Sequence, residues 1–152
     1  MSLEEKLRRV AERSAQQQLD WDARRIEWVE RVKQLCDEVE LWLKPYQDKG
    51  YLTVERSKKT LSEEFLGRYA IDELKIFVGE NTIVLEPLAR NVIGAHGRID
   101  FYLRGYKSDA LLLLLLEDGE GTLRWEVWKS KDTGFRKPFS RETFESILEQ
   151  WL

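Results

Sequence analysis

Residues 111–121 read Leu-Leu-Leu-Leu-Leu-Leu-Glu-Asp-Gly-Glu-Gly: six consecutive leucines followed by an acidic turn that contains glycine. A bilayer-spanning helix needs about 20 apolar residues, so this run is too short to be one. An apolar run that ends at an Asp-Gly turn is typical of a buried strand. Because alternate side chains of a strand point to opposite faces, both faces of this strand are apolar. The run therefore predicts a sheet with another layer packed on each side.

Shorter strand-like segments surround the leucine run. Residues 74–78 and 82–86 flank a Gly-Glu-Asn turn and predict a hairpin. Pro87 interrupts this pattern, so residues 87–97 are expected to form a bulged strand or a loop. Further strands are expected at residues 51–56, 98–104 and 122–129, whereas 60–70 is either a short helix or a loop and 130–138 is a charged loop. Short connections between successive strands predict an antiparallel meander of about five strands.

Helical patterns occupy both ends of the chain. Residues 2–44 contain no glycine or proline and are rich in helix formers, and Pro45 is expected to end this helix. The Gln-rich stretch 15–20 leaves open whether the helix is kinked there. Ser140 is a candidate N-cap for a short amphipathic helix at 140–152. The expected fold is thus a single α+β domain over residues 1–152, with a helical segment at 1–44, a sheet mainly within 51–129 and a C-terminal helix at 140–152.

Composition narrows the class of function. The chain has 152 residues, 35% of them charged, and a net charge of −3, which disfavours a bulk electrostatic nucleic-acid binder. The single cysteine, Cys36, permits no internal disulfide, and no Cys/His cluster indicates zinc. The first residues have no apolar stretch of the kind found in secretory signals. We therefore expect a cytoplasmic protein with no cofactor and no membrane association.

The strand at 98–104 carries the clearest polar constellation. Ile99, Phe101 and Leu103 share one face, and the other face holds four polar residues. Trp128, on the strand expected at 122–129 after the leucine run, is a fifth candidate. These candidate ligand- or partner-binding residues are Arg98, Asp100, Tyr102, Arg104 and Trp128. Arg, Tyr and Trp beside apolar side chains are typical of binding surfaces. The alternative is a structural cluster in which Asp100 pairs with a neighbouring arginine.

Two other chemistries fit parts of the same region. Asp100 on one strand and Glu117 at the end of the next resemble the layout of metal-dependent nucleases of the PD-(D/E)xK class, although no lysine follows Glu117 at the required spacing. Such a protein would be a degenerate metal-dependent hydrolase. Alternatively, Arg98 and Arg104 could bind a small anion or a nucleotide. His96, the only histidine, could act as a general base, but a lone loop histidine is a weak signal.

The long helix is the other functional candidate. Its first half carries a leaky seam with alternating spacings of four and three residues. That seam comprises Leu3, Leu7, Val10, Ser14, Gln17 and Trp21. The candidate oligomer or packing residues of the helix are Trp21, Trp28, Val32, Leu35 and Trp42. Since no complete catalytic set is present, the sequence favours a non-enzymatic protein–protein interaction module whose partners are another protein and a second copy of itself.

Overall fold

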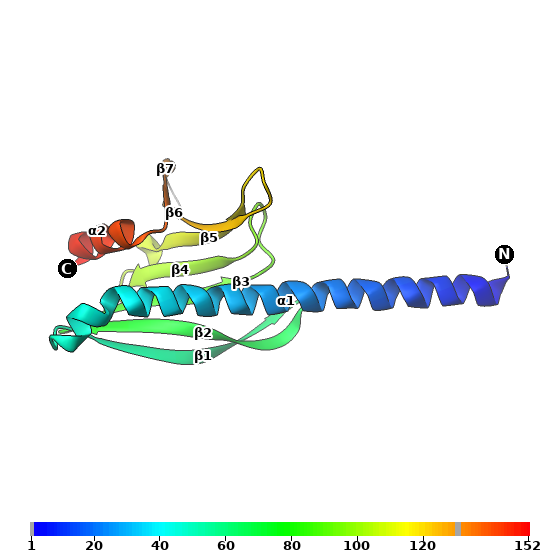
Figure 1. Ribbon diagram of the computed structural model, residues 1–152, viewed down its shortest axis with the longest axis horizontal. Helices are drawn as coiled ribbons and strands as arrows, with labels where there is room; N and C mark the ends of the chain where they lie inside the picture. The colour runs from blue at the N-terminus through cyan, green and yellow to red at the C-terminus, as the bar shows by residue number, and fades with distance from the viewer. Residues whose placement is uncertain (1, 130–131) are drawn as a thin grey trace.

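The computed structural model describes residues 2–129 and 132–152 (Figure 1). It contains two α-helices, one short 3-10 helix (η1) and seven β-strands. In chain order these are α1 (Leu3–Asp48), β1 (Thr53–Glu63), β2 (Gly67–Val78), β3 (Asn81–Ala89), β4 (Arg98–Leu103), η1 (Lys107–Asp109), β5 (Leu111–Glu117), β6 (Leu123–Lys129), β7 (Asp132–Pro138) and α2 (Arg141–Trp151). The expected α+β class is confirmed.

Helix α1 is longer and more regular than its sequence predicts. Its N-cap, Ser2, accepts a hydrogen bond from the backbone N–H of Glu5, and the helix then continues for 46 residues without interruption at 15–20. The prediction that Pro45 ends the helix is wrong, because α1 continues to Asp48. Proline removes only the hydrogen bond to the carbonyl of Leu41. Both residues lie on the exposed side of the helix, where water can satisfy that carbonyl.

The seven strands form one antiparallel sheet in sequence order, β1 to β7. The predicted hairpin is present as β2 and β3, and the register shifts between Pro87 and Ala89, so the expected irregularity after Pro87 is a bulge followed by a loop. The estimate of about five strands is low. Residues 132–138, predicted as loop, form edge strand β7, which pairs only with β6 and so tolerates Gly134 and Pro138. Residues 60–70, predicted as helix or loop, form the ends of β1 and β2 and the turn between them.

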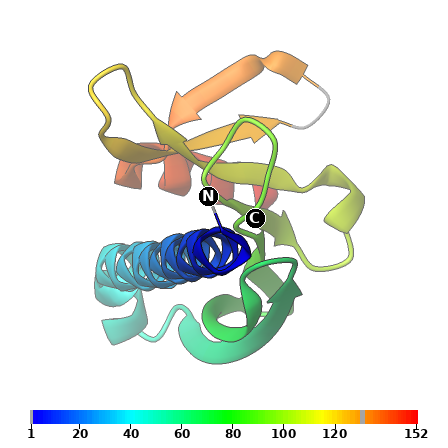
Figure 2. The ribbon, with the colours of Figure 1, turned by 90° about the vertical axis from the view of Figure 1, so that its right-hand side faces the viewer.

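Both helices lie on the same face of the sheet, which curves around them (Figure 2). Leu111, Leu113 and Leu115 point to this concave face and belong to the main core. Their neighbours Leu112, Leu114 and Leu116 point to the convex face, which no helix or strand of the described residues covers. The predicted second layer is therefore wrong: Leu114 is buried among side chains of its own sheet face, and Leu112 and Leu116 are half-buried.

The second half of α1 and all of α2 complete the core. Trp28, Val32 and Leu35 of α1 are each no more than 2% exposed. The Trp42 ring packs against Phe139 and Phe144 at centroid distances of 5.6 and 5.7 Å. As predicted, Ser140 caps helix α2: its Oγ accepts a hydrogen bond from the backbone N–H of Thr143. Within the described residues, neither helix has an apolar stretch that could cross a membrane.

Candidate functional site

The polar face of β4 forms part of the convex surface. Asp100 is only 5% exposed, and its Oδ1 accepts a hydrogen bond from Arg98 Nε at 2.9 Å. Asp100 faces Leu112 in β5, which in turn faces Trp128 in β6, so Asp100 and Trp128 share this surface with a strand between them. The Trp128 indole N–H donates to Glu126, and the guanidinium of Arg136 lies 4.1 Å from its ring centroid. The predicted residues thus take part in two separate contacts, Arg98 with Asp100, and Trp128 with Glu126 and Arg136.

The second polar group on the convex face centres on Glu86. Its carboxylate lies 2.6 Å from Lys59 Nζ and 3.1 Å from Lys107 Nζ, and it accepts a hydrogen bond from the Tyr102 hydroxyl. Burial by itself would raise the pKa of Glu86, but these donors lower it to about 2. Burial and the bond to Glu86 raise the pKa of Tyr102 to about 12. Tyr102 therefore belongs to the Glu86 cluster rather than to the Asp100 pair.

The structure separates the residues of the predicted metal site and those of the predicted anion site. The register places Asp100 opposite Leu112, which is five residues before Glu117, a separation of about 16 Å along the strand. Arg98 and Arg104 likewise do not converge, because Arg104 lies beyond the end of β4, where its backbone N–H donates to the carbonyl of Thr82. Among the described residues, no group of three or more potential metal-ligating side chains is present.

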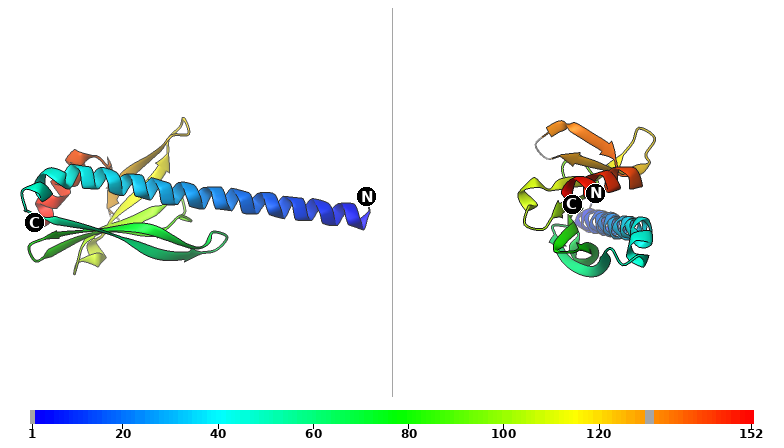
Figure 3. Two further views of the ribbon diagram at one scale, coloured as in Figure 1. Left: turned by 60° about the horizontal axis from the view of Figure 1, so that its bottom comes forward. Right: turned by 90° about the vertical axis from the view of Figure 1, so that its left-hand side faces the viewer.

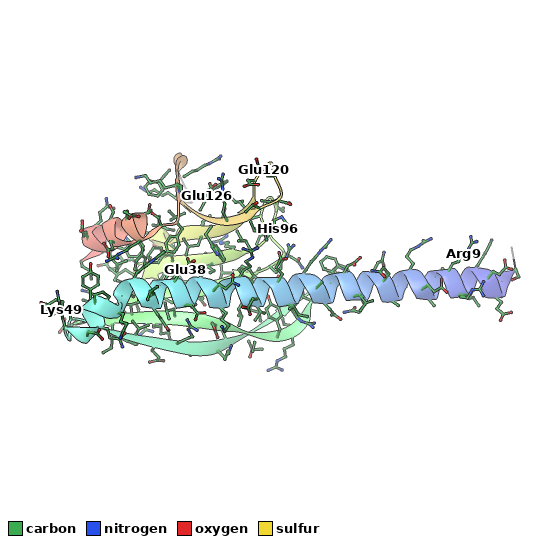
Figure 4. The ribbon with its side chains drawn as sticks, viewed as in Figure 1. Arg9, Glu38, Lys49, His96, Glu120 and Glu126 are labelled. Carbon is green, nitrogen blue, oxygen red and sulfur yellow. The ribbon has the colours of Figure 1, made fainter. Side chains whose placement is uncertain are left out.

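A polar network closes the end of the sheet from which α1 emerges, where His96 lies (Figure 4). The Glu63 carboxylate accepts from the backbone N–H groups of Arg90 and Asn91 and from the hydroxyl of Tyr69. The Arg90 guanidinium lies 3.3 Å from His96 Nδ1, and His96 Nε2 lies 3.3 Å from the Glu117 carboxylate. This network holds the loop after β3 against the turn between β1 and β2. Its members come from four separate segments of the chain, so no single sequence motif predicts this network.

An aromatic contact marks the point where α1 leaves the sheet. The Trp21 ring stacks on Phe65, at the turn between β1 and β2, with a centroid distance of 4.9 Å. Arg25 donates to the carbonyl of Leu66 in the same turn. Phe65 is 58% exposed and Ile93, in the loop after β3, is fully exposed. Trp21, Phe65 and Ile93 line a shallow open pocket at this point, which we term the neck pocket.

Beyond the neck pocket, α1 continues as a single helix away from the rest of the protein (Figure 3). Every residue from 3 to 20 is exposed, and this segment spans about 27 Å. Arg9, near the far end of this segment, lies well away from the sheet (Figure 4). We call residues 3–20 the projecting segment. It carries the first five members of the predicted seam, and Leu3, Leu7 and Val10 are 72%, 60% and 58% exposed.

The seam of the projecting segment is in phase with the buried face of α1. At about 100° per residue, Leu3, Val10 and Trp21 all lie within about 20° of Trp28, which is buried against the sheet. Leu19 lies about 180° from Trp28, on the opposite side. The apolar stripe that packs on the sheet thus continues past the neck pocket into a segment that is exposed throughout.

All five predicted helix residues, Trp21, Trp28, Val32, Leu35 and Trp42, pack within the domain. Trp21, which also stacks on Phe65, marks the point where the exposed stripe begins. No known family model matches the sequence, and neither curated proteins nor solved structures show significant similarity to it.

Proposed function

We propose that this protein is a non-enzymatic protein–protein interaction module that self-associates through its projecting segment. One observation carries the proposal: residues 3–20 are helical and exposed throughout, and they project away from the sheet (Figure 3). Most helical stability in proteins comes from packing an apolar face, and the second half of α1 has such packing whereas this segment has none. A partner that covers the seam would supply that packing.

The seam also has the chemical character that association requires. Leu3, Leu7 and Val10 are large apolar side chains at heptad spacing, and solvent covers all three in the single chain. Ser14 and Gln17 interrupt the stripe, so the seam is too weak for a tight permanent complex. Association with a dissociation constant on the order of micromolar is expected from so short a contact.

Two leucines of the projecting segment give a matched test. Leu7 lies on the seam and is 60% exposed, whereas Leu19 lies on the opposite side and is 62% exposed. Leu7→Asp should weaken self-association at least tenfold in sedimentation experiments, because it places a charge in the contact. Leu19→Asp makes the same chemical change outside the contact and should leave association unaltered. Equal behaviour of the two variants, or a monomeric parent protein at about 100 µM, would refute the proposal.

A further inference from the structure

We infer that the second copy binds antiparallel, with its first helical turn over the neck pocket. This inference rests on the proposed self-association and adds the orientation and the register. The first argument is steric. Since the seam faces the same side as the buried half of α1, a partner helix on the seam lies on the side where the sheet begins. In a parallel pair, residues 22–48 of the second copy would continue into the space that this copy's own sheet occupies.

An antiparallel pair avoids that collision. The second copy's helix then runs outward past residue 3, and its sheet lies beyond the far end of the projecting segment. The two sheets are separated by the paired helices. A two-fold axis near residue 12 relates the copies, and such an isologous contact closes as a dimer.

The register follows from matching the seam with itself. Pairing Leu3 with Trp21 of the second copy joins two apolar residues. The same register pairs Leu7 with Gln17 and Val10 with Ser14, so each of these apolar residues covers a polar one. A shift of one heptad inward would oppose Leu3 to Trp28, which is already buried under this copy's sheet. A shift outward would leave Gln17 and Trp21 unpaired. Only the first register uses all six positions.

Flanking charges support the same arrangement. Lys6, Arg13 and Asp20 each come directly before a seam residue. In an antiparallel coiled coil, side chains at such positions meet the same set of positions on the second copy. This pairing brings Lys6 beside Asp20 of the second copy twice, and Arg13 beside its own equivalent once. Two opposite-charge pairs thus outnumber one like-charge pair. In a parallel pair, Lys6 would meet Ala11 and Arg13 would meet Gln18, neither of which is charged. Asp20 would meet Arg25, but that arginine already pairs with Asp22 and donates to the carbonyl of Leu66 in its own chain.

The neck pocket provides a binding site for the first helical turn of the second copy. The second copy's Leu3 lies opposite Trp21, whose ring already stacks on Phe65. Ile93, which is fully exposed in the single chain, lines the same pocket. Burying Leu3 there would cover apolar side chains from three segments of the chain, namely α1, the turn between β1 and β2, and the loop after β3.

Disulfide cross-linking between two variants, each with one added cysteine, separates the orientations. Val10→Cys and Ser14→Cys are made in separate proteins, one extended by a tag so that the three cross-linked products differ in mass. In the antiparallel register Val10 faces Ser14, and each equivalent pair is offset by about 6 Å along the helix. Oxidation of the mixture should therefore yield mainly the product that joins the two variants, about tenfold over either homodimer. Cys36 is buried, and burial raises its thiol pKa to about 12, so the oxidised parent protein should stay unlinked and serves as the control.

Each other outcome overturns the inference in a distinguishable way. Predominant homodimers would establish a parallel pair and leave the proposed self-association standing. If the two variants give no cross-linked product although the parent protein sediments as a dimer, the dimer contact lies outside the seam. If the variants give no product and the parent is monomeric, both the inference and the proposed self-association are overturned. Far-UV circular dichroism of both variants would confirm that the exposed substitutions leave the fold intact.

Discussion

At the scale of single residues, orientation on the sheet determines the environment of neighbours with identical side chains. Leu113 points to the concave face and has no exposed surface, whereas Leu114 points to the convex face and is 7% exposed. In the adjacent strands, Leu114 has Arg98 on one side and Glu126 on the other. A carboxylate at position 113 would be sealed in the core, but one at position 114 could reach water and a guanidinium.

We therefore expect Leu113→Asp to prevent folding, at a cost of more than about 4 kcal/mol, because it buries an unpaired charge. Leu114→Asp should stay folded and lose only about 1–2 kcal/mol. Thermal melts of the two variants measure the difference. Equal loss of structure in both would mean that the convex face is covered after all, as the leucine run alone predicts.

Glu86 gives a second prediction at this scale, one that depends on pH. Its lowered pKa, about 2, means that the ionised cluster stabilises the fold above the unfolded-state value near 4.5, and that this stabilisation is lost as the pH falls toward 2. Glu86→Gln should thus cost about 2 kcal/mol at pH 7 and progressively less below pH 4. Denaturant titrations at several pH values test this. Glu80→Gln makes the same chemical change at an exposed turn position outside the cluster and serves as the matched control.

At the scale of elements, α1 has two halves with different roles. Residues 3–20 are exposed throughout, while the second half supplies six buried side chains to the core. Glu12→Pro and Gln34→Pro would break the same helix at exposed positions in each half. The first should reduce far-UV helicity and self-association while leaving the domain's melting temperature unchanged at low concentration. The second should unfold the domain. A lowered melting temperature for Glu12→Pro would reveal packing of the projecting segment within one chain.

Elements whose residues carry short-range signals could be predicted from the sequence, and elements that depend on distant residues could not. The hairpin of β2 and β3 and the capped α2 follow from short-range turn, cap and periodicity signals, and sequence alone located them. Strand β7 could not be located in this way, because an edge strand needs only one neighbour and the sequence of β7 resembles a charged loop. The seam of α1 was visible as a heptad pattern, but its exposure was not. The Glu63 and Glu86 clusters assemble residues from strands distant in sequence, so periodicity could not reveal them.

At the scale of the whole molecule, the projecting segment determines the shape of any assembly. Helix α1 is about 69 Å long, and in the antiparallel register two copies overlap over about 27 Å. The dimer should therefore be a rod of about 110 Å with one sheet at each end. A parallel pair would place both sheets at the same end and stay close to 70–80 Å.

Small-angle scattering distinguishes these shapes directly. The maximum dimension of the parent protein should rise from about 75 Å to about 110 Å as concentration increases through the dissociation constant. Leu7→Asp should keep the shorter dimension over the same range, and Leu19→Asp should follow the parent. A dimer mass without lengthening would contradict the end-to-end arrangement. Because the length depends on where the helices overlap, this measurement tests the register independently of any cross-link.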